Sequence, residues 1–289
     1  MIKKISLFIS TDGTDLAPKS PSMEWKTAIG RGSEATVYRI SRSTARRMCG
    51  DACTSTSCAK VFAVRALHRP APCLRHGMMF AAMTRHPHVA SVYAVEEATG
   101  QILLEYIGGG TLAVEVQAGA VSGVRAMCVM GHILQGLCHL HSYGCIHGDI
   151  NPSNVLVSTG SRACKLVDYF AASPRLGAPA YMAPEAVRGE TTFLSDVWSC
   201  GCVMLCLEGL PPWQREADLG DGECVIIQEA PALLYHLGCR AVAMHGPPER
   251  KLARVFRGFV DGIFAEPEWR RSVVELLEQH AEADASSEL

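Results

Sequence analysis

The sequence predicts an α+β fold with two lobes, a small sheet-rich lobe followed by a larger, mainly helical one. From Trp25 to Ile107, short runs rich in β-branched and aromatic residues alternate with turn residues. After the glycine run "GGGT" at 108–111, apolar residues recur every three or four positions instead. The chain has 289 residues, which is enough for two such lobes.

The small lobe is predicted to be an antiparallel sheet with one main helix. Its strand-like runs are "WKTAIGRGSEATVYRI", "KVFAVRAL", "ASVYAVEE" and "QILLEYI". The helix is expected over 72–85, since a helix tends to stop before a pair such as His86-Pro87. The insert 41–59 lengthens the hairpin between the second and third strands, and we expect it to be a solvated loop. The alternative is that the arginines of this insert bind a partner protein.

Two helices are predicted for the larger lobe. The first is amphipathic and carries its apolar face on Val124, Met127, Met130, Leu134, Leu137 and Leu140. The second, "LSDVWSCGCVMLCLEGL", is apolar nearly all round and is expected to be buried. The expected organisation is an N-terminal extension at 1–22, the small lobe at 23–107, the larger lobe at 108–282 and a tail at 283–289, with both chain ends loosely ordered.

Composition excludes several classes of partner. The net charge is −2 and Lys and Arg are spread along the chain, so no nucleic-acid partner is expected. No apolar run approaches the roughly 20 residues that span a bilayer, so no membrane span is expected. The start "MIKKISLFIS" has too short an apolar core for a signal peptide, which predicts an intracellular, cytoplasmic protein.

The 13 cysteines fit a reducing compartment. Cys200, Cys202 and Cys206 lie in apolar surroundings and should behave as small hydrophobic residues. Cysteines at 49, 53, 58 and 73 have no CxxC pair, so separate thiols are favoured over a zinc clip, which stays open as an alternative.

Seven short motifs follow one another along the chain. They are "GRGSEATVY" (30–38), "VFAVR" (61–65), "HGDINPSN" (147–154), "KLVDYF" (165–170), "YMAPE" (181–185), "SDVWSCG" (195–201) and "WRRSVVELLEQH" (269–280). Each alone has a structural explanation: glycines in a hairpin are usually turns, and Asp196 could be a helix cap. In this order and spacing, the chain from about Trp25 to about His280 resembles the eukaryotic protein kinase domain of the Ser/Thr type.

A subgroup is indicated by the run "RHPHVASVYAVEEATGQILLEYIGGGTLA" (85–113), with "GDI" and "YMAPE". These segments resemble the MAP kinase kinase kinase group. A divergent kinase-like chain of no defined group is the alternative.

The resemblance implies a site for ATP and Mg²⁺. Ile29, Val37, Ala63 and Leu156 would enclose the adenine, with Leu104 at the gatekeeper position and the main chain of Glu105 and Ile107 bonding its edge. Gly30 and Gly32 of the glycine loop and Arg65 would lie at the phosphates. Asp149 would accept the proton of the substrate hydroxyl, and Asn154 and Asp168 would ligate magnesium. Asp196 would brace the catalytic loop, and Glu185 would pair with Arg270 as a structural ion pair.

Several positions depart from the family. Arg65 replaces the lysine that grips the phosphates, Gly77 stands where the family has its orienting glutamate, and Asn151 replaces a lysine near the transferred phosphate. Tyr169-Phe170 replaces Phe-Gly. Gly148 replaces an arginine that receives an activation-loop phosphate, and Ser173 is the only Ser or Thr between Asp168 and Glu185, so loop phosphorylation is not expected to activate the protein.

Two function classes therefore compete. The first is a weak ATP- and magnesium-dependent Ser/Thr kinase that acts on protein substrates in a signalling cascade. The second is a pseudokinase that serves as a nucleotide-binding scaffold or allosteric partner of a signalling protein. The retained groups serve metal and proton handling and the lost groups serve phosphate neutralisation, so nucleotide binding is expected more strongly than fast transfer.

Overall fold

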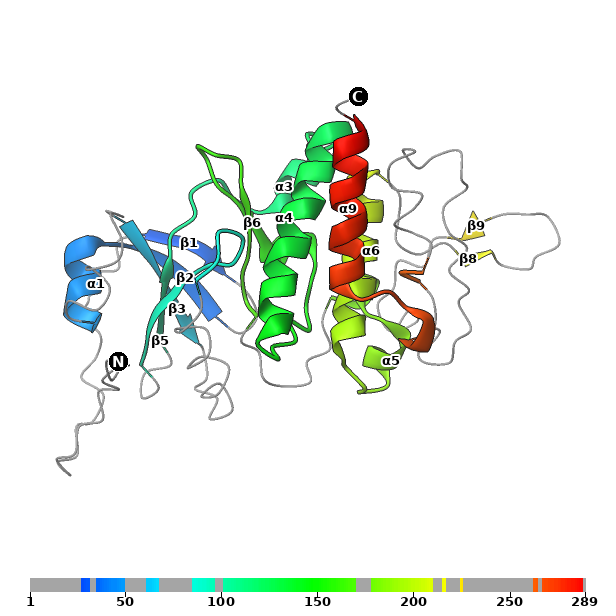
Figure 1. The fold of residues 1–289 in the computed structure, drawn as a ribbon. Helices are drawn as coiled ribbons and strands as arrows, with labels where there is room; N and C mark the ends of the chain where they lie inside the picture. Colours follow the sequence, from blue (N-terminus) through cyan, green and yellow to red (C-terminus); the bar gives the residue numbers. More distant parts are fainter. Residues whose placement is uncertain are drawn as a thin grey trace, which may run out of the picture. The chain divides into compact units, whose positions relative to one another are not determined.

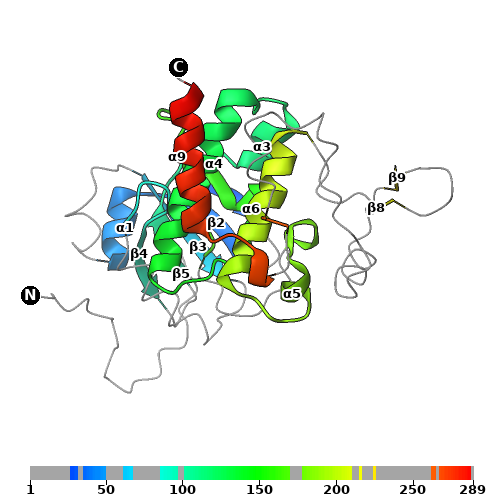
Figure 2. The ribbon, with the colours of Figure 1, turned by 45° about the vertical axis from the view of Figure 1, so that its right-hand side comes forward.

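The structure, a computed structural model, describes residues 27–31, 35–49, 61–67, 85–96, 101–169, 178–209, 215–216, 224–225, 262–264 and 267–287. The chain divides into two compact units (Figures 1 and 2). Unit 1 comprises Met1–Met78 and Ser91–Tyr106, and unit 2 comprises Met79–Ala90 and Ile107–Leu289. Unit 1 holds the main sheet and unit 2 holds the long helices, which confirms the predicted α+β fold.

Unit 1 contains an antiparallel sheet of five strands in the order β1-β2-β3-β5-β4. The strands are β1 (Thr27–Arg31), β2 (Ala35–Ser41), β3 (Val61–Leu67), β4 (Val92–Glu96) and β5 (Gln101–Glu105). Runs such as "VFAVRAL" suit a pleated sheet because β-branched and aromatic side chains pack well across neighbouring strands. Ile40, Val92, Ile102 and Leu103 are buried, so the predicted sheet is confirmed together with its core.

The insert after β2 is not wholly a loop, and the prediction was wrong for its first part. Residues Arg42–Cys49 form helix α1. Ser41 provides the start, because its hydroxyl accepts a hydrogen bond from the backbone N–H of Thr44 at 3.2 Å. Ala45 is fully buried while Arg42 and Ser43 are exposed, so one side of the helix faces the interior of unit 1. The rest of the insert, 50–59, and the predicted helix over 72–84 lie outside the described residues.

Unit 2 is built on α4 (Gly123–Ser142), α6 (Phe193–Leu207) and α9 (Val273–Ser287). Helix α4 contacts both of the others, and it runs alongside α9 in Figures 1 and 2. The apolar face predicted for α4 is confirmed, with Met127, Met130, Leu134, Leu137 and Leu140 all buried. Val124 is the exception: it lies in the first turn and is 81% exposed, because no described residue covers it.

The buried helix predicted around "WSCGCVML" is α6, and nearly all of its residues are buried. A capping box begins it, in which the side chain of Thr192 and that of Ser195 each accept a backbone N–H of the other. Burial raises the pKa of the Cys200 and Cys202 thiols, so both behave as the small apolar residues that were predicted.

Short elements complete unit 2. They are α3 (Leu112–Gln117), η2 (Pro152–Asn154), β6 (Val155–Val157), β7 (Cys164–Leu166), η3 (Pro179–Tyr181), α5 (Pro184–Val187), β8 (Arg215–Glu216), β9 (Cys224–Val225) and η4 (Pro267–Trp269). Strands β6 and β7 form an antiparallel hairpin. The tail was predicted to be loosely ordered, but α9 continues to Ser287 and corrects that expectation.

The segment 85–90 lies against α4 and β7. Leu166 and the segment exchange backbone hydrogen bonds, from Ala90 N to Leu166 O and from Leu166 N to His88 O, both 2.9 Å. Gly136 of α4 permits the close approach, because a Cβ there would lie 2.6 Å from the carbonyl oxygen of His88. Four histidines meet at this contact and are called the histidine cluster below: His86, His88, His132 and His139.

Candidate active site

Asp196 of α6 holds the loop 147–154 in place through hydrogen bonds to its backbone. The Asp196 carboxylate is 1% exposed and accepts the backbone N–H of His147 at Oδ2 and that of Gly148 at Oδ1, both at 2.8 Å. His141 of α4 adds a third bond from Nε2 to Oδ2 at 2.9 Å. A buried carboxylate needs such donors to offset its loss of water. The predicted bracing role of Asp196 is therefore confirmed.

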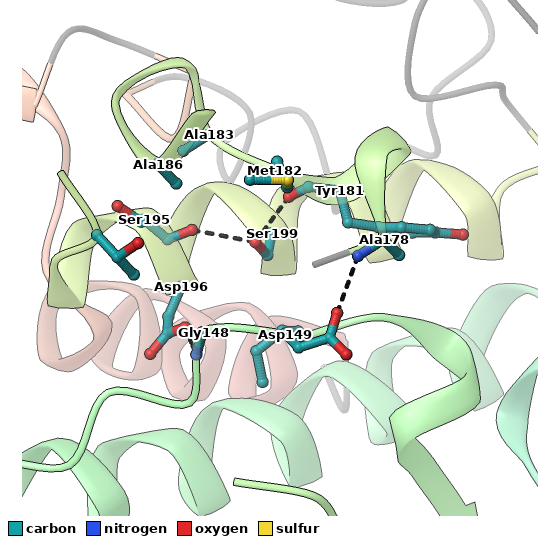
Figure 3. Close-up of a pocket in the computed structure, with 12 residues that line it drawn as sticks. Gly148, Asp149, Ala178, Tyr181, Met182, Ala183, Ala186, Ser195, Asp196 and Ser199 are labelled. Atoms are coloured by element: carbon teal, nitrogen blue, oxygen red, sulfur yellow. Dashed lines mark hydrogen bonds between the residues drawn. The ribbon is translucent and has the colours of Figure 1, made fainter. Parts of the chain in front are cut away.

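Asp149 presents its carboxylate from this braced loop. Asn151 donates from Nδ2 to Oδ1 at 2.9 Å, and Asn154 donates from Nδ2 to Oδ2 at 2.7 Å. The backbone N–H of Ala178 donates to Oδ1 at 3.0 Å, a bond visible in Figure 3. Three N–H groups thus fix the orientation of the residue predicted to act as the base.

The hairpin of β6 and β7 explains why the two predicted metal ligands come together. Val155 pairs with Leu166, and Val167 donates its N–H to the carbonyl oxygen of Asn154 at 3.0 Å. Asn154 and Asp168 therefore lie at the same end of the hairpin, although 14 positions separate them. Asp168 has φ of +68°, a left-handed conformation that Asp tolerates better than most residues.

The donor atoms at this end of the hairpin suit magnesium. Mg²⁺ prefers carboxylate and amide oxygens. The amide nitrogen of Asn154 is turned to Asp149, which leaves its oxygen for a cation, and Asp168 adds a carboxylate. The residues present therefore fit the predicted metal.

Tyr169 follows Asp168 where the family has phenylalanine. The ring is buried, and its hydroxyl donates to the carbonyl oxygen of Ala90 at 2.9 Å. The extra hydroxyl thus ties this turn to the segment before β4, which a phenylalanine could not do. Phe170, which replaces the family's glycine, lies outside the described residues, as does Ser173.

The residues predicted to surround the nucleotide lie partly in unit 1. Its strands hold Ile29, Gly30, Val37, Ala63, Arg65, Leu104 and Glu105. In the register of the sheet, Val37 lies opposite both Gly30 and Arg65. Ala63 lies opposite Leu104, so these positions are neighbours in the sheet. Ile29 is 45% exposed and Leu104 is half-buried. Gly32 and Gly77 lie outside the described residues.

Glu105 can offer only part of its main chain. Its N–H donates to the carbonyl oxygen of Ser91 at 2.8 Å, and its side chain accepts the N–H of Ser91 at 3.1 Å. The N–H of Glu105 is therefore already used within unit 1. Ile107 and Leu156 belong to unit 2, where both are half-buried and Leu156 forms an isolated bridge with Thr111.

A pocket lies beside Asp149 in unit 2 (Figure 3). Its lining comes from the loop 147–154, the segment 178–191 and the start of α6: Gly148, Asp149, Ile150, Ala178, Tyr181, Met182, Ala183, Ala186, Thr191, Ser195, Asp196 and Ser199. The Ser199 hydroxyl donates to the carbonyl oxygen of Tyr181 at 2.7 Å, and the Tyr181 hydroxyl contacts the Cys206 sulfur at 3.4 Å. These bonds attach the "YMAPE" segment to α6.

The expected ion pair of Glu185 and Arg270 is confirmed. The guanidinium makes two bonds to the carboxylate, at 2.5 and 3.3 Å, and both side chains are buried. Ser195 donates a further bond at 2.9 Å. Burial alone would raise the pKa of Glu185, but the hydrogen bonds and charge of Arg270 outweigh it and hold the pKa below its usual value.

Two contributors to the site were not predicted. His141 adds a donor to Asp196, and Ala178 supplies a backbone N–H to Asp149. The bond from His141 depends on α4 lying beside α6, which the sequence does not reveal. The N–H of Ala178 is a backbone group that almost every residue type has, so the sequence could not single it out. Within the described parts of the chain, no group of three or more His, Cys, Asp or Glu residues is arranged as a ready-made metal site, and the cysteines at 53, 58 and 73 are not described.

The protein kinase domain profile matches residues 23–281. The chain belongs to the protein kinase family. Mitogen-activated protein kinase kinase kinase 17 of Arabidopsis thaliana is 33% identical over 215 residues, which cover 67% of this chain and 54% of that protein. The MAP kinase kinase kinase wis4 of Schizosaccharomyces pombe is 30% identical over 223 residues, 66% of this chain and 15% of that protein. This kinase chain thus spans about half or less of these relatives.

A solved structure agrees with the fold. Rad53 residues 1–466 in complex with AMP-PNP superimposes with a TM-score of 0.66 at 24% identity, covering 88% of this chain and 63% of that one. Membership of the kinase family implies use of ATP, typically with Mg²⁺. None of the helices in the described part of the kinase domain has the length and apolar character needed to cross a bilayer.

Proposed function

We propose that this kinase domain transfers the γ-phosphoryl group of ATP to Ser or Thr hydroxyls of a protein substrate in a signalling cascade, at a low rate. The observation that carries the proposal is the Asp149 carboxylate, held by three N–H groups on a loop that Asp196 braces. Such preorganisation is what a proton acceptor requires. The MAP kinase kinase kinases among the relatives favour a protein substrate. The cytoplasmic location stays a prediction from the sequence.

Different residues of the chain would serve proton transfer, metal binding and nucleotide binding. Asp149 accepts the proton of the substrate hydroxyl, while Asn154 and Asp168 would hold Mg²⁺, which neutralises phosphate charge when bound. Ile29, Val37, Ala63 and Leu156 would contact the adenine, with Leu104 at its back, and the carbonyl of Glu105 and the main chain of Ile107 would bond its edge. Gly30 and Gly32 would lie over the phosphates. We assign the boundary between the two lobes to residues 107 and 108.

The low rate follows from the phosphate-binding positions. Arg65 keeps a positive charge, but Gly77 offers no carboxylate to orient it. Asn151 supplies a neutral amide where the family has a cation. The same losses support the alternative function, a pseudokinase that binds nucleotide and acts as a scaffold or allosteric partner.

One substitution separates the two functions. Asp149→Asn should reduce phosphate incorporation into a generic Ser/Thr protein substrate by roughly 100-fold or more, as expected for loss of a general base. Radiolabelled ATP with Mg²⁺ provides the assay, and Mg²⁺-dependent thermal stabilisation by ATP should persist in the variant. If ATP binds while wild-type protein and variant incorporate equally little phosphate, the pseudokinase function is correct.

A further inference from the structure

Asn151 forms hydrogen bonds with Ser153 and Asp149, and these two partners fix the orientation of its side-chain amide. The side chain is buried, and its Oδ1 accepts the backbone N–H of Ser153 at 2.9 Å, which caps η2. Its Nδ2 therefore faces Asp149 and donates to the carbonyl oxygen at 3.1 Å and to Oδ1 at 2.9 Å. Lysine has three donors and no acceptor, so it could not cap Ser153 as well.

The bonds on Asp149 are distributed unevenly between its two oxygens. A carboxylate oxygen accepts about two hydrogen bonds. Oδ1 receives two, from Asn151 Nδ2 and from the Ala178 N–H. Oδ2 receives one from the described residues, from Asn154 Nδ2. An acceptor position therefore remains on Oδ2, on the side of the carboxylate that contacts the predicted metal ligand Asn154.

We propose that Asn151 is a positioning residue: it fills Oδ1 of Asp149 together with the Ala178 N–H, and so makes Oδ2 the oxygen that accepts the proton of the substrate hydroxyl. This inference rests on the proposed function. As the hydroxyl oxygen bonds to the γ-phosphorus, the bond from that phosphorus to the ADP oxygen breaks. The hydroxyl proton passes to Oδ2 of Asp149, so the atoms balance without a further reactant.

Three substitutions at position 151 test the proposal. Asn151→Ala removes the donor to Oδ1 and should lower kcat about 10-fold with little change in KM, because the bond acts on the chemical step. Asn151→Asp places a second carboxylate against Oδ1 and should also move the acid limb of the kcat profile to higher pH. Asn151→Ser keeps one acceptor for Ser153 and one donor for Asp149, and should recover most of the rate.

A matched control comes from the same loop. Ser153→Ala keeps the backbone N–H that Asn151 accepts and removes only an exposed hydroxyl, so kcat and the pH profile should stay as in the wild type. Asn151→Ser also guards against a variant that fails to fold, because it retains the cap of η2.

A second measurement, by NMR, tests the positioning of Asp149 and does not depend on phosphoryl transfer. Both side-chain bonds of Asn154 go to Asp149, to the carbonyl oxygen at 2.9 Å and to Oδ2 at 2.7 Å. The NMR signals of the Asn154 side-chain amide therefore report the position of the Asp149 carboxylate. They should shift in Asn151→Ala, return in Asn151→Ser and stay unchanged in Ser153→Ala.

The two readouts separate the two possible failures. If the wild type transfers no phosphate, the proposed function and the proton step are wrong, and the Asn154 signals still decide whether Asn151 positions Asp149. If the wild type transfers phosphate but Asn151→Ala changes neither kcat nor the Asn154 signals, and Asn151→Asp leaves the pH profile as in the wild type, the proposed function stands and the positioning role is overturned.

Discussion

Unit 2 contains two polar networks, one built on buried carboxylates and one on histidine rings of which only His88 is fully buried. The carboxylate network consists of Asp196 with His141 and the N–H groups of the catalytic loop, and of Glu185 with Ser195 and Arg270. The histidine cluster joins its four rings in two stacked pairs, with centroids 4.7 Å apart for His86 and His139 and 4.1 Å apart for His88 and His132. The first network is built on carboxylates, and in the second the environment disfavours the charged form of His86, His132 and His139.

The lowered pKa values of three rings in the histidine cluster have identifiable causes. Burial lowers the pKa of His86 to about 4, with the neighbouring His139, His88 and Lys165 acting in the same direction. Burial likewise lowers the pKa of His132 to about 4, assisted by His88, Arg125 and His280, and it also lowers the pKa of His139. The comparison indicates that the loop 147–154 is stabilised by a buried carboxylate, whereas burial disfavours charge on His86, His132 and His139.

The largest effect is expected from the carboxylate network. Asp196→Asn keeps the size of the side chain but leaves one oxygen for three donors, and its new N–H groups would face them. Buried donors that lose their acceptor are costly, so the free energy of unfolding should fall by about 2–4 kcal/mol. Urea unfolding at pH 7 measures it.

The control for this variant is Glu278→Gln, an exposed carboxylate on α9 that should change the free energy of unfolding by no more than about 0.5 kcal/mol. An equally small change in Asp196→Asn would mean that the braced loop does not depend on charge, and the contrast between the two networks would be lost.

Acidification should act on the histidine cluster first. In the unfolded chain, histidine protonates near pH 6.5, whereas His86 and His132 in the fold do so near 4. Between these values the unfolded chain binds more protons, so the free energy of unfolding should fall as the pH drops from about 6.5 to about 4, by about 1–2 kcal/mol per ring after allowance for solvent screening. Glu185 has a lowered pKa, so its contribution is lost only as the pH falls through its usual 4.5 and below.

His139→Phe sharpens this test. The ring that stacks on His86 is kept, while a charge source beside His86 is removed. The Nε2 of His139 is buried without a hydrogen bond to any described residue, so little is lost at pH 7. Urea unfolding at pH 7, 6 and 5 should show a smaller decline than in the wild type, and Glu278→Gln should show the wild-type decline. Equal declines in all three proteins would assign the acid sensitivity to groups outside the cluster.

The sequence predicted the elements whose signals are local. The β-branched strands and the apolar faces of α4 and α6 were visible in residue spacing, because burial of one face imposes that spacing. Helix α1 was missed although Ala45, Met48 and Cys49 recur at helical spacing, because "RSTARRMC" is only eight residues long and rich in arginine. Its features in the fold are the Ser41 cap and the buried Ala45.

The site divides in the same way. Asp149, Asn154 and Asp168 were predicted as a set because their motifs resemble those of the protein kinase family, in which these positions handle the proton and the metal. The donors that orient Asp149 were not predicted, since the N–H of Ala178 is a backbone group and the amide of Asn151 is turned by its cap on Ser153. The histidine cluster could not be anticipated either, because positions about 50 residues apart meet only once α4 packs on the segment before β4.

The smallest effect is expected for alanine substitutions at Gly148 and Gly144. Comparing the two separates the hydrogen bond from Gly148 to Asp196 from the cost of backbone strain. Gly148 has φ of +74° and Gly144 has φ of +75°, and a Cβ at either position would meet no atom within 4 Å. Alanine in this left-handed region costs about 1 kcal/mol through its backbone alone. The two alanine substitutions are thus matched in strain and in free space, and only Gly148 donates to Asp196.

We expect Gly148→Ala and Gly144→Ala to lower the free energy of unfolding by the same amount, about 1 kcal/mol, because the bond to Asp196 tolerates a methyl group at position 148. Urea unfolding of the two variants at pH 7 gives the comparison. A loss at Gly148 that exceeds the loss at Gly144 by about 1 kcal/mol or more would show that the bond from Gly148 to Asp196 depends on a geometry that alanine cannot reach. Glycine would then be required at position 148 by the carboxylate network itself, in addition to removing the arginine that could receive an activation-loop phosphate.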